Sequence, residues 1–148
     1  MNTDQLTIFF YGLFMDKSLL TSKGVHPTET AIAYVDGYRL HIGQRATLLS
    51  EANSRAYGVL MRIDSEDAAA LYSEQSVADY VAEPVVVKLP GGTQVSAVCY
   101  NLPAAKLTGS NPEYATALLA LATKLKLPDS YLDHIKAAAY KGEFDALE

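Results

Sequence analysis

The sequence predicts an α+β fold in which a mixed or antiparallel sheet curls around a core and helices pack outside it. Strand-like segments fill the first two thirds of the chain with one short helix among them, and helical patterns occupy the last third. This order differs from the β-α-β alternation of a parallel doubly wound sheet. Of the 148 residues 49% are apolar, which is enough for a core, and the length predicts a single domain over residues 1–148.

Six segments are predicted as strands because apolar residues run or alternate in them between turn residues. The first, Leu6–Phe10, ends at a glycine-containing loop. The second, Ala31–Ile42, is interrupted at Asp36–Gly37, which fits either two short strands around a turn or one bulged strand. Pro84 has no N–H, so its segment begins at an edge or a bulge, and Lys88–Thr93 (KLPGGT) has the residues of a hairpin connection. The remaining segments are Ala46–Leu49, Ala56–Ile63, Val81–Leu89 and Val95–Tyr100.

Two regions are predicted to be helical. Asp64 is the expected N-cap of a short helix at Ser65–Tyr72, where its carboxylate would accept a backbone N–H. In the last third, Asn111 caps a helix that begins with Pro112, and Pro128 separates it from a second helix. Apolar residues at helical spacing form the two buried stripes: Tyr114, Leu118, Leu121, Ala122 and Leu125, then Tyr131, Ile135 and Ala138.

Charge and cysteine content exclude several classes of function. Twelve Lys and Arg against seventeen Asp and Glu give a net charge of −5, which argues against a nucleic-acid partner. His26, His41 and His134 are far apart in the sequence and Cys99 is the only cysteine, so we expect no disulfide, no metal site and no cofactor. Cys99 lies in a predicted strand, and a buried cysteine that packs as a small hydrophobe is favoured there over a nucleophile.

The amino-terminal segment predicts a cytoplasmic protein without a membrane partner. Its first residues, MNTDQLTIFFYGLFM, lack the Lys or Arg and the small-residue cleavage site of a signal peptide. The apolar stretch Leu6–Met15 is about half the length of a membrane span.

Two local features have chemical potential beside an ordinary structural interpretation. In Tyr11–Met15 (YGLFM), Gly12 allows a ligand to approach the backbone and successive N–H groups can form an anion-binding nest, although a tight turn has the same residues. Glu74 follows the short helix as a solvated carboxylate or, within an apolar pocket, as a base with a raised pKa. Tyr80, Tyr100 and Tyr114 come at the edges of predicted elements, where a ring can pack inward while its hydroxyl meets a polar partner.

The order of these short motifs resembles the γ-glutamylcyclotransferase family, including its AIG2-like members, along nearly the whole chain. YGLFM is similar to the family's Y-G-S-N-L loop, and Glu74 falls where the catalytic glutamate of its L-D-x-x-E-G segment belongs. Further matches follow in order at Gly37–Leu40, Arg45–Leu48, Tyr57–Leu60, Tyr80, Val85–Val87, Tyr100, Asn111–Tyr114 and Leu127–Tyr131.

The resemblance implies a mixed, mostly antiparallel small β-barrel flanked by helices, with a cavity at one end. Known members release 5-oxoproline from γ-glutamyl compounds when the substrate's own α-amine attacks its γ-carbonyl, which requires no protein nucleophile. The resemblance further implies an enzyme of glutathione metabolism that is a monomer or homodimer, takes a small γ-glutamyl substrate and uses Glu74 as general acid/base. Backbone N–H groups of Tyr11, Gly12, Leu13, Phe14, Met15 and Asp16 would hold substrate oxygens, Tyr114 would donate to the substrate carboxylate, and Tyr80 and Tyr100 would line the wall.

The sequence also departs from the family pattern, which keeps two alternatives open. Leu13 and Phe14 replace the usual Ser and Asn of the loop, and Gln75 replaces the Gly that follows the glutamate. An apolar cavity mouth suits a γ-glutamylamine or a γ-glutamyl-protected biosynthetic intermediate. The other alternative is a module that binds a small carboxylate without catalysis.

Overall fold

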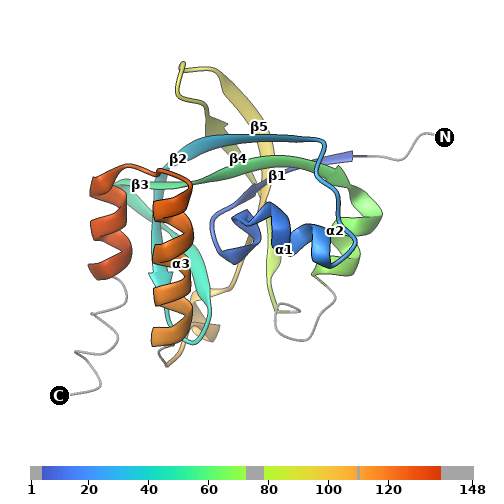
Figure 1. Ribbon diagram of the computed structural model, residues 1–148. Helices are drawn as coiled ribbons and strands as arrows, with labels where there is room; N and C mark the ends of the chain where they lie inside the picture. The colour runs from blue at the N-terminus through green and yellow to red at the C-terminus, as the bar shows by residue number, and fades with distance from the viewer. Residues whose placement is uncertain (1–4, 73–78, 110, 138–148) are drawn as a thin grey trace.

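Five strands of the computed structural model close into a ring; the structure describes residues 5–72, 79–109 and 111–137. The strands are β1 (Gln5–Phe10), β2 (Glu29–Ile42), β3 (Ala46–Asp64), β4 (Val81–Lys88) and β5 (Gln94–Asn101). Their order around the ring is β1-β3-β2-β4-β5 (Figure 1), and β5 pairs with β1 to close it. The β1–β5 pairing is parallel, whereas the other neighbouring pairs are antiparallel. The predicted α+β fold with a mixed, mostly antiparallel sheet is therefore confirmed.

The long β2–β3 ribbon corrects one strand prediction. The segments Ala46–Leu49 and Ala56–Ile63 were expected as two strands, but they belong to the single strand β3. Both halves pair with β2, so the chain does not leave the sheet between them. Of the two interpretations of Ala31–Ile42, a single irregular strand is right, because Glu29–Ile42 is continuous and its register shifts between Asp36 and Tyr38. Asp36 pairs with Arg55 and Tyr38 with Ser50, so the extra residues of this irregularity lie on β3, opposite Gly37 (φ 85°).

The hairpin and the proline of the fourth strand lie where they were predicted. Leu89 N–H donates to Thr93 O at 2.9 Å, and Gly92 has a φ of 93°, so Lys88–Thr93 forms the connection between β4 and β5. Pro84 pairs with Val98 of β5. The β2–β4 register contains only Tyr34 opposite Lys88, so no described residue of β2 requires the N–H that Pro84 lacks.

Helices in the first half of the chain were predicted only in part. A 3₁₀ turn η1 (Leu13–Met15) and a helix α1 (Lys17–Ser22) follow β1 and were missed. Asp16 caps α1, since its Oδ1 accepts from the Ser18 N–H at 2.9 Å. The next helix, α2 (Ser65–Leu71), is one residue shorter than expected. Asp64 occupies its N-cap, but the predicted capping bond from its side chain is absent.

The carboxy-terminal helices confirm the sequence pattern. Helix α3 (Pro112–Lys124) begins with the predicted proline, and Asn111 Oδ1 accepts from the Tyr114 N–H at 3.0 Å. Residues 129–137 form the next helical segment, on which Tyr131 and Ile135 are buried; Ala138 lies outside the described residues. In Figure 1 these two helices lie together on one side of the view and α2 on the other. A short 3₁₀ turn, η3 (Ala104–Lys106), precedes α3.

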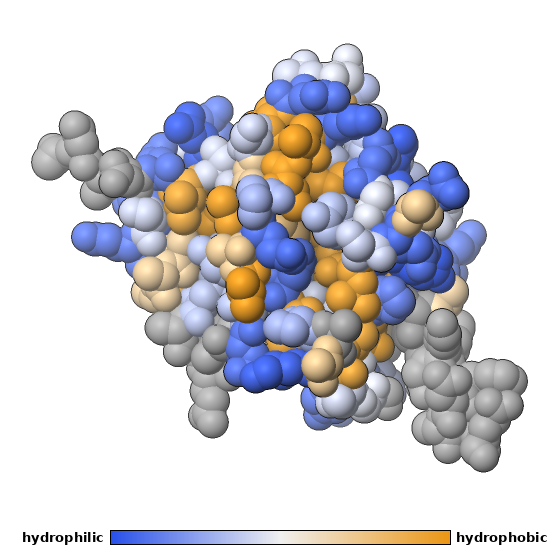
Figure 2. Space-filling view, turned by 180° about the vertical axis from the view of Figure 1, so that it is seen from behind, coloured by the Kyte–Doolittle hydropathy of each residue, from blue (hydrophilic) through white to orange (hydrophobic). Residues whose placement is uncertain are grey.

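The core fills the ring and the space beneath the helices. Its largest fully buried side chains come from all three regions of the chain: Ile8, Phe9, Met15, Leu20, Leu40, Leu48, Met61, Ile63, Leu71, Leu102, Leu118 and Ile135. The face in Figure 2 shows apolar patches separated by hydrophilic side chains. No described helix has the length and apolar character needed to cross a membrane.

Candidate active site

The candidate site is built on the loop that leaves the end of β1. That strand is held very close to β3, because a Cβ atom at Gly58 would overlap the backbone carbonyl of Phe10 and lie 2.9 Å from the Phe9 ring. Only glycine permits this approach. Gly58 of the Tyr57–Leu60 motif therefore lets the end of β1, from which the loop leaves, lie close against β3.

The loop folds as a 3₁₀ turn that uses two of its own N–H groups. Met15 N–H donates to Gly12 O and Asp16 N–H donates to Leu13 O, both at 3.0 Å. These two N–H groups were expected to hold substrate oxygens, and the turn already employs them. Within the part of the chain that the structure describes, no backbone bond of this kind uses the N–H groups of Gly12 or Phe14.

A small aromatic cavity of about 60 Å³ opens beside this loop. We call it the aromatic cavity, and it is lined by Phe9, Phe10, Tyr11, Gly12, Phe14, Ala46, Tyr72, Tyr80 and Tyr100. The fold thus brings together five of the site residues expected from the sequence, which come from the loop after β1, the residue before β4 and the strand β5. Those five are Tyr11, Gly12, Phe14, Tyr80 and Tyr100.

Tyr72 is a wall residue that was missed among the sequence candidates. Its ring stacks on that of Tyr100, with centroids 3.8 Å apart and an interplanar angle of 9°. Phe14 meets it edge-on at 5.8 Å and contacts Phe10 in the same way at 6.0 Å. Such edge and stacked arrangements are favourable for aromatic pairs. The only sequence signal was the position of Tyr72 at the end of a predicted helix, two residues before Glu74.

The hydroxyl groups of the cavity serve as hydrogen-bond donors. Tyr11 donates to the carbonyl of Tyr100 at 2.8 Å, and Tyr80 donates to the carbonyl of Ala46. Burial raises the pKa of Tyr11, Tyr72, Tyr80 and Tyr100 above the ordinary tyrosine value. These phenols consequently remain protonated at neutral pH, and none of them can take a proton from a substrate.

Tyr114 reaches the loop from the first turn of α3. A Cβ atom at Gly12 would lie 2.5 Å from the Tyr114 hydroxyl oxygen, so the ring tip rests on the loop backbone. Burial raises the pKa of Tyr114 to about 12, and a hydrogen bond with the backbone of Leu13 opposes that rise. Tyr114 is therefore a neutral donor beside the aromatic cavity, although it does not line it.

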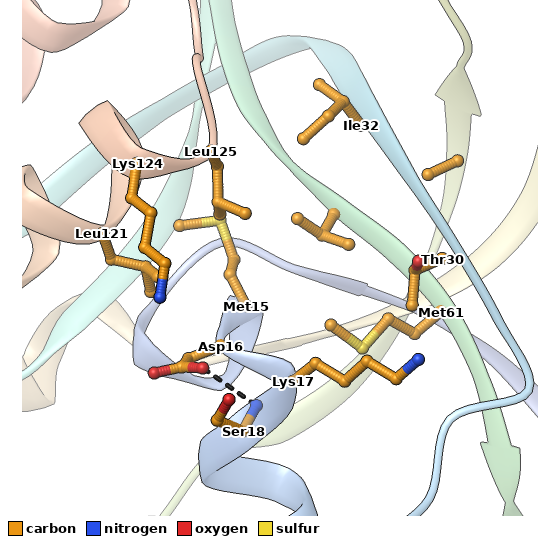
Figure 3. Close-up of a pocket in the computed structure, with 12 residues that line it drawn as sticks. Met15, Asp16, Lys17, Ser18, Thr30, Ile32, Met61, Leu121, Lys124 and Leu125 are labelled. Atoms are coloured by element: carbon orange, nitrogen blue, oxygen red, sulfur yellow. Dashed lines mark hydrogen bonds between the residues drawn. The ribbon is translucent and has the colours of Figure 1, made fainter.

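The other predicted site residues lie elsewhere. Leu13 packs partly buried against the core, whereas Met15 and Asp16 line a second pocket of about 330 Å³ (Figure 3). Glu74 lies outside the described residues. Cys99 is fully buried and its thiol pKa is raised to about 12 by burial, so it is no thiolate nucleophile at neutral pH.

A cluster of charges fixes the chain where β4 begins. Asp79 lies 3.4 Å from both Arg45 Nη2 and Lys106 Nζ, and the field of Lys106 is the main cause that lowers the Asp79 pKa. The Arg45 guanidinium also lies 5.9 Å from the centre of the Tyr80 ring. Among the described residues, no group of three His, Cys, Asp or Glu side chains could hold a metal ion.

Known proteins were compared with the chain at the level of sequence and of fold. A family model described as "Gamma-glutamyl cyclotransferase, AIG2-like" matches residues 8–117. No curated protein sequence matches the chain. Among solved structures, a "Gamma-glutamyl cyclotransferase" superposes with a TM-score of 0.71 and 17% identity over 90% of this chain and 88% of the other.

Two further structures show the same fold. A γ-glutamyl cyclotransferase from yeast, described as specific to glutathione, has a TM-score of 0.64 and 16% identity over 95% of this chain and 97% of its own. YkqA from Bacillus subtilis has a TM-score of 0.74 and 21% identity, and the match covers 93% of this chain and 55% of that protein.

Proposed function

The chain belongs to the Gamma-glutamyl cyclotransferase, AIG2-like family, and on this premise we propose that it cyclises a γ-glutamyl amide to 5-oxoproline. The reaction releases a free amine or amino acid, and Glu74 acts as general acid and base. The aromatic cavity is the proposed seat of the reaction.

One observation carries the proposal. The described wall of the aromatic cavity contains no base, whereas the segment that joins its wall residues Tyr72 and Tyr80 contains Glu74. The lining contains aromatic side chains, Gly12 and Ala46, and its phenols stay protonated. Residues 73–78 connect Tyr72 to the segment that begins Asp79–Tyr80. Glu74 is the second residue after Tyr72 in this connection, so the proposed base is a close neighbour of the cavity wall in the sequence.

The proposed reaction needs one proton carrier and no protein nucleophile. Glu74 takes a proton from the substrate's α-ammonium group, and the resulting amine attacks the γ-carbonyl carbon. A C–N bond closes the five-membered ring while the carbonyl oxygen gains negative charge. Protonated Glu74 then gives this proton to the leaving nitrogen, and the amide C–N bond breaks as the carbonyl re-forms. The regenerated Glu74 carboxylate removes the second proton from the ring nitrogen, which becomes the lactam N–H, and this proton leaves with the released amine or to solvent. Both reacting groups belong to one molecule, so the protein supplies orientation and proton transfer.

Neutral donors of the loop and of α3 are the proposed substrate contacts. The N–H groups of Gly12 and Phe14 would meet the carbonyl oxygen, where fixed dipoles stabilise developing charge. The Tyr114 hydroxyl would donate to the substrate carboxylate, and Tyr80 and Tyr100 would form the wall. Met15 and Asp16 contribute to the shape of the loop instead, since their N–H groups are bonded within it.

A substitution that keeps the shape of the proposed base and removes its charge tests this function. Glu74→Gln should fold with an unchanged melting temperature and lower kcat/KM for 5-oxoproline release by roughly 10²–10⁴-fold. Glu66→Gln, the same change at an exposed position of α2, is the matched control and should retain full activity. Unaltered turnover by Glu74→Gln would refute the assigned role.

Phe14 supports a second candidate substrate class. This side chain occupies the position of a polar family residue and packs against Phe10 and Tyr72 in the cavity wall. A γ-glutamylamine with an apolar leaving amine would bury more apolar surface there than a γ-glutamyl amino acid. Turnover of a γ-glutamyl-alkylamine should then exceed that of γ-glutamyl-alanine. Tight binding of a small carboxylate without release of 5-oxoproline from any γ-glutamyl compound would instead indicate a non-catalytic binding module.

A further inference from the structure

The second pocket is larger than the aromatic cavity and is lined by Met15 and Asp16, which follow the cavity-lining residues of the same loop. Its volume of about 330 Å³ falls within the range of small-molecule sites. Met15 and Met61 are almost fully buried in its floor, and Ile32, Leu121 and Leu125 are partly buried around it. The pocket therefore offers an apolar interior formed by the loop, by β2 and β3, and by the end of α3.

Charged side chains surround this interior at the surface. Lys17 begins α1 and Lys124 ends α3, and both line the pocket although they are far apart in the sequence. Figure 3 shows Lys124 extending from α3 toward Asp16 and Lys17 extending toward Met61. One oxygen of Asp16 already accepts the Ser18 N–H at 2.9 Å. The rim thus carries two positive charges and one negative charge.

The two lysines have no acidic partner among the residues that the structure describes, unlike the cations of the ion pairs. Lys88 and Lys106 form ion pairs with Asp36 and Asp79. Neither Lys17 nor Lys124 is within 4.0 Å of a carboxylate oxygen among the described residues. In a chain with a net charge of −5, two unmatched ammonium groups beside one apolar pocket favour an anionic occupant.

We propose that the second pocket binds a small amphiphilic carboxylate, with its apolar chain on Met15 and Met61 and its carboxylate between Lys17 and Lys124. Burial of the apolar chain supplies the affinity, and the two ammonium groups select the sign of the head group. The site does not depend on the proposed reaction, because it shares no side chain with the aromatic cavity. It does share the loop, since Met15 follows Phe14 directly.

Methionine methyl signals provide a direct test of this site without an activity assay. The chain has three methionines, and two of them line the pocket, so ¹³C-methyl spectra of the full chain would report occupancy. Octanoate should shift the Met15 and Met61 signals saturably. Octylammonium, with the opposite charge, and butyrate, with a shorter chain, should each bind at least about tenfold more weakly.

Variants of the rim separate recognition from nonspecific association with an apolar surface. The double variant Lys17→Gln/Lys124→Gln should keep the wild-type melting temperature and bind octanoate at least about tenfold more weakly. Lys136→Gln removes one charge from an exposed position outside the pocket lining and should bind normally. Equal binding of octanoate and octylammonium, or unweakened binding by the double variant, would overturn the proposal. Methyl shifts that depend on the protein concentration and not on the octanoate concentration would also overturn the proposal, because a second copy of the chain would then occupy the pocket.

Discussion

The hydroxyl oxygen of Tyr114 touches the backbone at Gly12, so closely that a Cβ atom there would lie 2.5 Å from it. Gly12 has a φ of −108°, a value that any residue adopts, so glycine is required by this contact and not by backbone conformation. Helix α3 consequently presses on the loop of the candidate site through one side chain.

Substitution of Gly12 by alanine should destabilise the protein through this contact alone. We expect Gly12→Ala to lower the free energy of unfolding by about 1–3 kcal/mol because the loop or the ring must move. In a Tyr114→Phe background the nearest remaining atom named in the contact is the ring carbon at 3.8 Å, so the same change should cost much less. Urea unfolding of the four proteins gives the coupling energy. Additive effects would show that the hydroxyl contact is not the cause.

Gly58 should tolerate alanine even less. A Cβ atom at that position meets the carbonyl of Phe10 and the Phe9 ring, and backbone in a paired strand cannot easily withdraw. Gly58→Ala should lower the free energy of unfolding by about 3 kcal/mol or more. Gly91→Ala is the matched control, since nothing lies within 4 Å of its added Cβ, and it should change stability by less than about 0.5 kcal/mol. A similar loss at both glycines in urea titrations would contradict the steric explanation.

The Tyr72–Tyr100 stack should matter for both stability and turnover. Tyr72→Phe keeps the ring and should be nearly neutral, whereas Tyr72→Leu removes the stacked pair and should cost about 0.5–1.5 kcal/mol beyond the lost burial. Because Tyr72 leads into the segment that carries Glu74, the leucine variant should also release 5-oxoproline more slowly. Thermal unfolding and product assays of both variants measure these effects. Indistinguishable behaviour of the two variants would argue against a role for the stack.

His134 should make stability depend on mildly acidic pH. Its ring stacks on Tyr131 at 5.7 Å, and burial, followed by the nearby Arg39, lowers its pKa. The unfolded chain then binds more protons than the folded chain below about pH 6.5. The stability contributed by neutral His134 is therefore complete above that pH and is lost as the pH falls through the folded-state pKa.

Comparison of variants isolates this contribution from that of the carboxylates. Between pH 7 and pH 5, wild-type protein should lose more of its free energy of unfolding than His134→Gln does. His26→Gln, a change at an exposed histidine, should retain the wild-type pH dependence. Parallel stability curves for wild type and His134→Gln would disprove the assignment.

Local sequence signals predicted those parts of the fold that depend on neighbouring residues. Asn111 and Pro112 start α3 because their cap and ring geometry act within one turn, and Lys88–Thr93 turns because Gly92 permits a positive φ. The same kind of signal was present at Asp16 but was overlooked. The Asp64 side chain shows the limit of such signals, since a suitable residue occupied the N-cap position without making the capping bond.

Sequence by itself determined the α+β class, the glycines and the tyrosines from which a site could be made, because these follow from side-chain chemistry and short-range periodicity. Only the tertiary structure decided which of those residues meet. Closure of the strand ring brings Tyr72, Tyr80 and Tyr100 against the loop, while one turn of 3₁₀ helix directs Met15 and Asp16 into a different pocket. Contacts between residues distant along the chain depend on packing of the whole core, so no local pattern predicts which of these residues meet.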